Sequence, residues 1–377
     1  MLLAFVVALA MTIVGLGSPS ASASDDAARF APLPVSGVTA QSAFVLDSSV
    51  GTPLLALNPD EQRSPASLTK LMTALVVVEH GDLEATVTIA ETDLASESES
   101  RVGLVAGDTL TVRDLLAGLL IPSGNDAARA LARTVGLVLD PSAADAEQAT
   151  RAFVAEMNAT AAKLGAANTH FVNPTGLDVD GQHSSARDIA IIGATALQNS
   201  LVREFTSTVS MTLKSTANPD GYPIHTTNDL LVDESVQGGK TGTTESAGGC
   251  VLTYFEEGRN LIIAVVLGSA LEHDEEGNPH SPARFDDMRL IMSNLTAEFR
   301  WVSPEDRTSF PGLSDELSAW DAVLASDVDV PVPTDAADPA RFRLVLGPAA
   351  APDNPVGTVR FFSGPDLLAE QPVLQGK

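Results

Sequence analysis

Two residues in the first part of the chain, Ser67 and Lys70, have the types and spacing of a nucleophile and its base. Serine attacks poorly at neutral pH unless a neighbouring group takes its proton. Residues three apart share one face of a helix, so Lys70 would reach Ser67 if this segment is helical. Lys70 accepts a proton only when it is neutral. Burial or a nearby second cation lowers the pKa of a lysine, and we expect Lys240 to be that cation. A capping serine beside a solvated lysine is the alternative that this spacing alone leaves open.

Ser123-Gly124-Asn125 supplies short polar groups on a turn between two expected helices. Ser123 can relay a proton between Lys70 and a leaving amine. Asn125 can hold an amide of a substrate, because its side chain both donates and accepts hydrogen bonds. Plain helix N-capping by either residue is the alternative for this motif taken by itself.

Lys240-Thr241-Gly242-Thr243 completes the set and lies on an expected strand. Lys240, Thr241 and Thr243 offer donors for a carboxylate, and Gly242 lets a substrate backbone approach closely because it has no side chain. The backbone N–H groups of Ser67 and Thr243 are our candidates for an oxyanion hole. An edge strand with a solvated lysine is the alternative, but the three motifs together predict a serine acyl-transfer enzyme.

The segments around these motifs predict how they are positioned. Apolar residues recur at helical spacing from Leu68 to Glu79, so Ser67 begins a mostly apolar helix. Residues Ser42 to Leu57 are typical of a hairpin. Further helices are expected over Leu110–Leu120 with Thr111 as N-cap, Asp126–Val135, Ala143–Leu164, Ser185–Gln198 with Ser184 or Ser185 as N-cap, and Ser281–Phe299; further strands are expected over Val87–Ala90, Val209–Leu213, Gly238–Thr243, Gly249–Phe255 and Asn260–Gly268. This order favours an α+β fold in which helices cover an antiparallel sheet.

The character of the chain changes after Trp301. Prolines and acidic residues dominate Ser303 to Asp338, and three short strands are expected beyond them, over Arg341–Leu346, Val356–Phe362 and Ala369–Leu374. We therefore expect a catalytic domain over residues 24–302, and over residues 303–377 an acidic, proline-rich linker with a small β-rich domain.

The N-terminal residues predict export. An uncharged apolar run from Leu2 to Gly17 is followed by Ala21-Ser22-Ala23, which is typical of a signal-peptide cleavage site, so residues 1–23 are expected to be removed. No Lys or Arg precedes the run, and an uncleaved anchor is the alternative, although the run is shorter than the ~20 residues that a membrane span needs. We expect an extracytoplasmic protein, either associated with the cell wall or secreted, with membrane contact only through this segment.

The composition and charge of the chain limit the kinds of partner and ligand that we expect. The net charge of −27 argues against a nucleic-acid partner. Cys250 is the single cysteine, so no intrachain disulfide can form, and its apolar surroundings predict a buried residue. No group of His, Cys or carboxylate residues has metal-ligand spacing, so we expect neither a metal nor a cofactor.

The motifs resemble those of the low-molecular-weight penicillin-binding proteins, the serine D-alanyl-D-alanine carboxypeptidases of the peptidase S11-like family. The resemblance covers about Phe44 to Phe299, is faint beyond that, and is carried by Pro65–Leu75, Ser123–Ala128, Phe171–Leu177 and Gly239–Gly242. It implies a β-lactamase/transpeptidase-like fold, with Ser67 as acyl-ester nucleophile, Lys70 as proton acceptor, Ser123 and Asn125 in the site and Lys240 in substrate binding. It also implies peptidoglycan stem peptides ending in D-Ala-D-Ala as substrates and β-lactam antibiotics as covalent inhibitors.

Departures from the family bear on attachment and substrate preference. The chain ends at Lys377 after a strand-like stretch, where the family often has an amphipathic anchoring helix, and Thr243 stands where many members have an aromatic residue or histidine. A class A β-lactamase is one alternative, but it needs a deacylating glutamate, and neither Glu147 nor Glu156 has the expected Glu-x-x-Leu-Asn sequence. A D,D-endopeptidase and a non-enzymatic binding protein that keeps the fold are the others.

Overall fold

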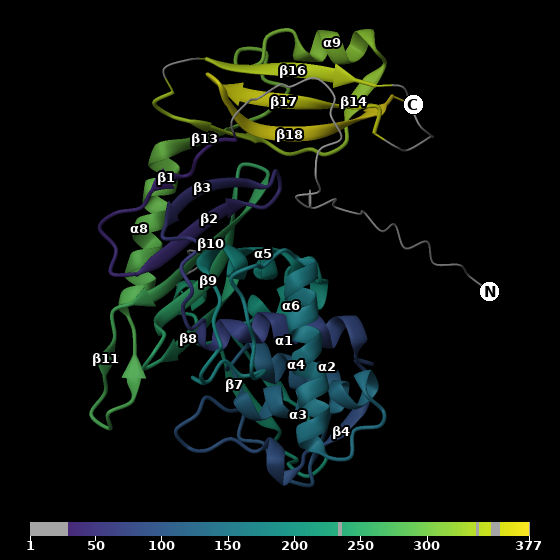
Figure 1. Cartoon of the computed structure of the whole chain (residues 1–377), viewed down its shortest axis with the longest axis vertical. Helices are drawn as coiled ribbons and strands as arrows, with labels where there is room; N and C mark the ends of the chain where they lie inside the picture. Colours follow the sequence, from purple (N-terminus) through teal and green to yellow (C-terminus); the bar gives the residue numbers. More distant parts are fainter. Residues whose placement is uncertain (1–28, 233–235, 337–338, 348–354, 377) are drawn as a thin grey trace, which may run out of the picture.

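The computed structural model describes residues 29–232, 236–336, 339–347 and 355–376. The signal peptide expected over residues 1–23 lies outside these ranges. No helix within them is long and apolar enough to cross a membrane. Figure 1 shows a large body of sheet and helices with a smaller β-rich body above it.

A six-stranded sheet runs through the large body in the order β1-β3-β2-β10-β9-β8. Its strands are β1 Leu33–Pro34, β2 Ser42–Asp47, β3 Thr52–Leu57, β8 Gly238–Thr244, β9 Gly248–Glu257 and β10 Asn260–Ser269. All neighbours are antiparallel except β1, which pairs in parallel with β3. The hairpin expected over Ser42–Leu57 is confirmed as β2–β3, and the expected strands over Gly249–Phe255 and Asn260–Gly268 are β9 and β10, which also pair. Among the described strands β8 has one sheet neighbour, so its outer edge can pair with an added strand.

Helices cover both faces of this sheet, as expected (Figure 1). Helices α1 (Thr69–His80) and α5 (Ala186–Ala196) pack on one face, and α8 (Ala283–Glu298) packs on the other. Helices α2 (Val112–Leu120), α3 (Asn125–Leu139) and α4 (Ala146–Lys163) pack around α1. Leu71, Met72, Val76 and Val77 of α1 are fully buried, as in a helix that lies within a core. The residues that precede α1 are therefore held between the helical layer and β8.

Capping residues place two of the helix starts. The side chain of Thr111 accepts the backbone N–H of Asp114 at the start of α2, and that of Ser185 accepts the N–H of Asp188 at the start of α5. Both caps are as expected from the sequence.

Several short elements escaped sequence reasoning, because tertiary contacts rather than local patterns determine them. They are α6 (Ser200–Thr206), α7 (Asp229–Val232), β7 (Tyr222–His225), which pairs with β6 (Ser210–Leu213), and the hairpin of β11 (Glu272–His273) and β12 (Pro279–His280). The strand expected over Val87–Ala90 is β4 (Thr86–Thr88), and its partner β5 (Thr109–Thr111) occupies the expected start of α2.

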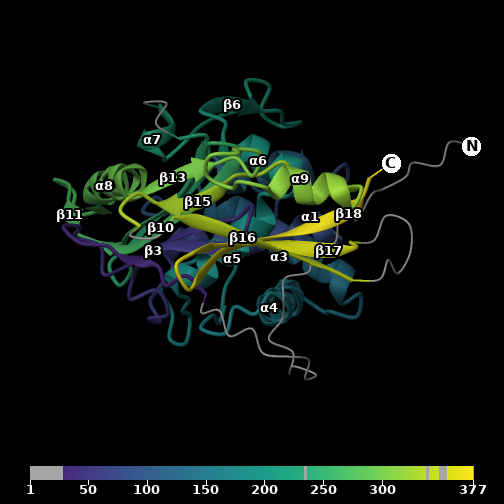
Figure 2. The ribbon, with the colours of Figure 1, turned by 90° about the horizontal axis from the view of Figure 1, so that it is seen from above.

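The C-terminal region is folded from its beginning, which corrects the expected linker. Residues 303–336 contain helix α9 (Leu313–Ala319) and strands β14 (Ala322–Leu324) and β15 (Val330–Pro333), and they bury Phe310 and Leu313 in a hydrophobic core. Strand β15 pairs with β13 (Phe299–Val302). The remaining sheet, in the order β14-β18-β17-β16, contains the three expected strands as β16 (Ala340–Leu346), β17 (Gly357–Ser363) and β18 (Asp366–Gln375). Figure 2 shows α9 lying alongside this sheet.

A buried polar network joins the two bodies. Asn260 Nδ2 and Trp301 Nε1 donate to Asp47 Oδ2 at 2.7 and 3.1 Å, and Asn260 Oδ1 accepts the N–H of Asp329 at 2.7 Å. Burial raises the pKa of Asp47 to about 6, even though these hydrogen bonds favour its ionised form. The network therefore fixes the end of β2 and the β9–β10 turn against β15.

The two ends of the described chain meet at the same junction. The backbone N–H of Phe30 donates to the carbonyl of Leu367 at 3.0 Å, and the Thr52 hydroxyl donates to the carbonyl of Leu368. The Phe30 ring lies edge-on to Phe299, with centroids 5.7 Å apart. These contacts connect strand β18, near the end of the chain, to residues at its beginning.

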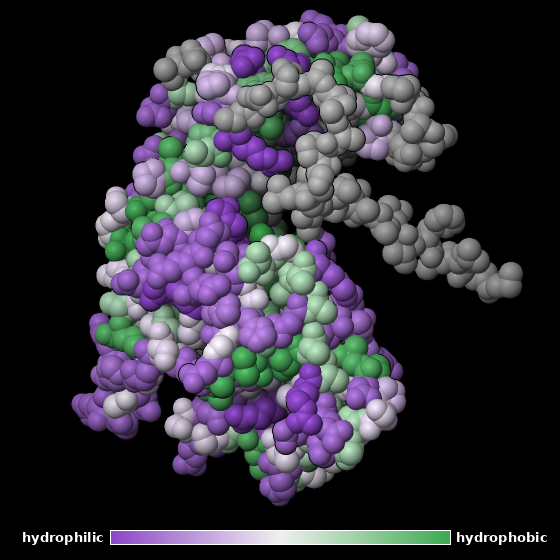
Figure 3. Space-filling view, in the orientation of Figure 1, coloured by the Kyte–Doolittle hydropathy of each residue, from purple (hydrophilic) through white to green (hydrophobic). Residues whose placement is uncertain are grey.

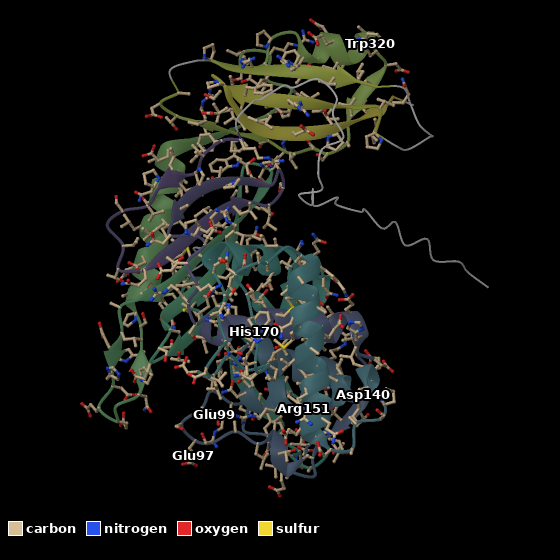
Figure 4. The ribbon with its side chains drawn as sticks, viewed as in Figure 1. Glu97, Glu99, Asp140, Arg151, His170 and Trp320 are labelled. Carbon is tan, nitrogen blue, oxygen red and sulfur yellow. The ribbon has the colours of Figure 1, made fainter. Side chains whose placement is uncertain are left out.

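One face of the large body is largely hydrophilic. Figure 3 shows hydrophilic residues gathered over the middle of this face of the large body. Trp320, which is 64% exposed, lies on the C-terminal body far from the helical layer (Figure 4).

Candidate active site

Ser67 and Lys70, the candidate nucleophile and base, are in contact at the start of α1. Lys70 Nζ is 2.8 Å from Ser67 Oγ and donates to the carbonyl of Thr175 at 2.6 Å. Lys70 is fully buried, whereas Ser67 is half-buried and can meet a substrate. Ser67 lies in a short 3-10 helix, Ala66–Leu68, whose first residue has a φ of +46°. That left-handed conformation is costly for alanine and is typical of functional sites.

The buried position of Lys70 explains how it can act as a base. Burial, and then the positive charge of Arg129, lower its pKa to about 7, while Glu99 and Asp126 act in the opposite direction. The sequence prediction that Lys240 supplies the perturbing cation is therefore replaced by Arg129. Near neutral pH a large fraction of Lys70 is unprotonated and able to take the Ser67 proton.

Ser123 and Lys240 form a second serine–lysine pair, close enough to the first for the charge of Lys70 to act on Lys240. Lys240 Nζ donates to Ser123 Oγ and to the Thr241 carbonyl, both at 2.8 Å. Burial, and then the charges of Lys70 and Arg284, lower the pKa of Lys240 well below its ordinary value. Ser123 has a φ of +64°, so the turn before α3 holds it in a left-handed conformation.

Gly242 lies directly against the nucleophile. A Cβ atom there would lie 2.7 Å from Ser67 N and 2.9 Å from Ala66 Cβ. The sequence prediction gave room for a substrate as the reason for this glycine, but the residues that need the room are Ala66 and Ser67. Thr243, next along β8, is thereby brought close to the Ser67 amide, and its hydroxyl accepts from Arg284 Nη1.

Asn125 is oriented by a carboxylate. Its Nδ2 donates to Glu99 Oε2 at 2.9 Å, and the same oxygen accepts from Arg129 Nη2 at 2.6 Å. The other oxygen of Glu99 accepts the N–H and hydroxyl of Ser96. Asn125 Oδ1 is buried with no hydrogen-bond partner among the described residues, so it is a free acceptor for an N–H group. Figure 4 shows Glu99 on a loop beside the helical layer.

A model of the D-alanyl-D-alanine carboxypeptidase family, peptidase S11, matches residues 28–270. The chain belongs to this family. It is a serine peptidase of the D-alanyl-D-alanine carboxypeptidase family, with the expected α+β fold.

Individual relatives agree with this assignment. The chain is 33% identical over 257 residues to D-alanyl-D-alanine carboxypeptidase DacF of Bacillus subtilis, with 67% of this chain and 62% of that protein covered. It is 30% identical over 376 residues to DacD of Salmonella typhimurium, with 95% of this chain and 90% of that protein covered. Similarity thus extends through the C-terminal region, which the sequence resemblance left faint.

A solved structure also has this fold. The crystal structure of the Streptomyces K15 DD-transpeptidase has a TM-score of 0.61 at 32% identity, and the match covers 68% of this chain and 97% of that one.

Sequence reasoning assigned no role to several residues that position the site. Thr175 and Gly176 lie in the segment that resembles the family, and the Thr175 carbonyl holds Lys70. Gly176 has a φ of +86°, and a Cβ there would lie 1.9 Å from the Ala66 carbonyl oxygen. Arg284, at the start of α8, donates to the Gly242 carbonyl at 3.1 Å. No local pattern marks Arg284 or Glu99, because the contacts of both are made across the fold.

Cys250 is buried, as expected. Burial raises its thiol pKa to about 11, so it is not a nucleophile at neutral pH. The described residues contain no group of three or more His, Cys, Asp or Glu side chains that could hold a metal ion.

Substitutions at the Glu99–Arg129 pair should shift the pH dependence in opposite directions. Acylation should fall as the pH drops through about 7, because protonated Lys70 cannot accept the Ser67 proton. Arg129→Met leaves the negative charge of Glu99 unbalanced and raises the pKa of Lys70. The acidic limb of the pH–rate profile then moves to higher pH. Glu99→Gln leaves the positive charge of Arg129 and moves the limb to lower pH.

The measurement is the second-order rate of penicillin acylation across neutral pH for the original protein and both variants. Glu99→Gln should also lower the plateau rate, because Asn125 loses its fixed orientation, but the position of the limb is independent of that loss. Two shifts of the same sign would contradict this account of Lys70.

Proposed function

We propose that this protein is an exported serine D,D-carboxypeptidase that removes the terminal D-Ala from peptidoglycan stem peptides. The observation that carries the proposal is the pair of serine–lysine contacts, Ser67 with Lys70 and Ser123 with Lys240, each at 2.8 Å in one cleft. Export is supported by the apolar run and cleavage-site sequence in residues 1–23.

In the acylation step, Ser67 Oγ attacks the carbonyl carbon of the penultimate D-Ala as its proton passes to Lys70. The amides of Ser67 and Thr243 stabilise the oxyanion. The peptide C–N bond then breaks, and the leaving amine of the terminal D-Ala receives a proton from Lys70 through Ser123. Water hydrolyses the Ser67 ester and releases the shortened peptide. A β-lactam ring presents the same kind of carbonyl, so penicillins acylate Ser67 as well.

The polar groups around the cleft suit the rest of the substrate. Asn125 Oδ1 is free to accept a peptide N–H. The Arg284 guanidinium supplies positive charge, and Lys240 and the Thr241 hydroxyl supply donors, at one part of β8, which suits the terminal carboxylate.

The geometry also bears on the β-lactamase alternative. Glu99 is the carboxylate that contacts Asn125, but both of its oxygens already accept hydrogen bonds, from Ser96 on one side and from Asn125 and Arg129 on the other. It is thus engaged in positioning and is not oriented as a base for a deacylating water.

Intact-mass measurement after mixing with benzylpenicillin, together with D-Ala release from Nα-acetyl-L-Lys-D-Ala-D-Ala, tests the proposal. We expect one stable penicillin adduct per chain, located on Ser67, and the release of one D-Ala for each peptide cleaved. A protein that forms no adduct and releases no D-Ala would refute the proposed function.

A protein that ends at Val302 should acylate within a few-fold of the full chain, because every residue of the cleft precedes Phe299. It should be less stable, since the truncation removes Asp329 from the Asn260 network and β15 from its pairing with β13. Acylation rate and thermal unfolding of the shortened protein measure the two effects. A hundredfold loss of rate in folded protein, about 2.7 kcal/mol of barrier, would mean that the C-terminal body shapes the cleft.

A further inference from the structure

Charge is distributed unevenly along the free edge of β8. Lys240 and Arg284 lie at the Lys240–Thr243 part of the strand. Two carboxylates lie at the opposite end: Asp178 accepts the Thr244 hydroxyl at 2.8 Å, and Glu245 directly follows Thr244. A peptide that pairs with this edge therefore meets the Arg284 guanidinium and the Lys240 donor at one end and negative charge at the other.

This polarity fixes the direction in which a peptide with a free C-terminus binds. Its terminal carboxylate belongs beside Lys240, Thr241 and Arg284, since the other direction would place it against Asp178 and Glu245. With the scissile carbonyl at Thr243, the residue that precedes the scissile D-Ala then lies opposite Thr244. An acceptor for a peptide N–H is independently present at Asn125 Oδ1, which is buried without a partner among the described residues.

The side chain of that preceding residue shares the face of Thr244, because residues opposite each other in paired strands point to the same side of a sheet. Alternate residues of β8 point toward the helical layer: Lys240 reaches Ser123, Gly242 abuts the Ser67 amide, and the Thr244 hydroxyl reaches Asp178. The side chain of the preceding residue is thus directed to Asp178.

The Asp178 carboxylate is exposed, and the hydrogen bonds it accepts within the described ranges come from uncharged groups. These donors are the Ser64 hydroxyl at 3.1 Å, the Thr244 hydroxyl at 2.8 Å and the Ser246 N–H at 3.2 Å. They hold the carboxylate in place without neutralising its charge. Glu245, in contrast, is paired with His273 at 2.9 Å.

We infer that Asp178 is a specificity residue that binds a free amine on the side chain of the residue preceding the scissile D-Ala. The preferred stem peptides would then carry a diamino acid with an unblocked side-chain amine at that position. This inference rests on the proposed carboxypeptidase function and names the substrate class of the same cleft.

The test compares kcat/KM for two peptides, Nα-acetyl-L-Lys-D-Ala-D-Ala and its Nα,Nε-diacetyl analogue. The original protein should prefer the free amine by about fivefold at low salt, the size of an exposed ion pair of about 1 kcal/mol. Asp178→Asn keeps an oxygen for Thr244 but loses the charge. In this variant the ratio of kcat/KM between the free-amine and the diacetyl peptide should fall to about one, because only the free-amine peptide is cleaved more slowly. Added salt should reduce the ratio of the original protein in the same way.

Asp180→Asn is the matched control, because Asp180 is an exposed carboxylate two residues further along the same loop. Its ratio should equal that of the original protein. Equal turnover of both peptides by the original protein, or an unchanged ratio in Asp178→Asn, would overturn the inference while leaving the carboxypeptidase function intact. Failure to cleave either peptide would instead overturn the proposed function, and the inference with it.

Discussion

Ser67→Ala should lower penicillin acylation and D-Ala release by roughly 10⁴-fold or more, as expected when a serine nucleophile is removed. The remaining contacts of the cleft bind and polarise the substrate but cannot form the ester. Lys70 keeps its hydrogen bond to the Thr175 carbonyl in the variant, and the deleted hydroxyl is half-buried, so the fold should be retained.

Intact mass, D-Ala release and thermal unfolding together decide this prediction. The matched control is Ser210→Ala, at an exposed serine of β6, which should behave like the original protein in all three measurements. A penicillin adduct of normal rate on the Ser67→Ala protein would show that another residue is the nucleophile.

Gly176→Ala should reduce acylation by roughly a hundredfold, about 2.7 kcal/mol of barrier. The added Cβ would lie 1.9 Å from the Ala66 carbonyl oxygen, so either the Ala66–Ser67 backbone or the loop must move. Movement of the Ala66–Ser67 backbone displaces the nucleophile, and movement of the loop withdraws the Thr175 carbonyl from Lys70.

Gly181→Ala separates this clash from backbone strain. Gly181 lies in the same loop with a φ of +89°, close to the +86° of Gly176, but a Cβ there would have no atom nearer than 3.8 Å. Both variants bear the cost of alanine in a left-handed conformation. We expect Gly181→Ala to acylate within a few-fold of the original protein. Equal losses in the two variants would show that loop strain, rather than the contact with Ala66, causes the defect.

The parts of the site that local sequence determines could be predicted. The helix that follows Ser67 and the strand that carries Lys240 have clear apolar patterns, and each motif lies where its pattern indicates. The contact between Ser67 and Lys70 follows from their helical spacing, whereas the contact between Ser123 and Lys240 was not predicted, since the two residues are 117 positions apart.

The parts of the site that depend on contacts across the fold could not be predicted. Glu99 reaches Asn125 from a loop without a regular pattern, and Arg284 reaches β8 from a helix on the other face of the sheet. The role of Lys240 was misjudged for the same reason, since which cation perturbs Lys70 depends on the packing of α3. The acidic, proline-rich stretch after Trp301 was taken for a linker because its few apolar residues, such as Phe310, are too widely spaced to show periodicity.

If the protein is exported as proposed, the contact between Phe30 and Leu367 has a consequence for the order in which it can fold. A chain that crosses a membrane through a translocon from its N-terminus delivers Phe30 first and Leu367 almost last. The hydrogen bond between them, and that between Thr52 and Leu368, cannot form until nearly the whole polypeptide has emerged. Strand β2 likewise cannot pair with β10, its neighbour in the middle of the sheet, until β10 has emerged. In an exported chain the N-terminal strands would therefore lack these partners until late in translocation, so the sheet and its junction with β18 could form only then.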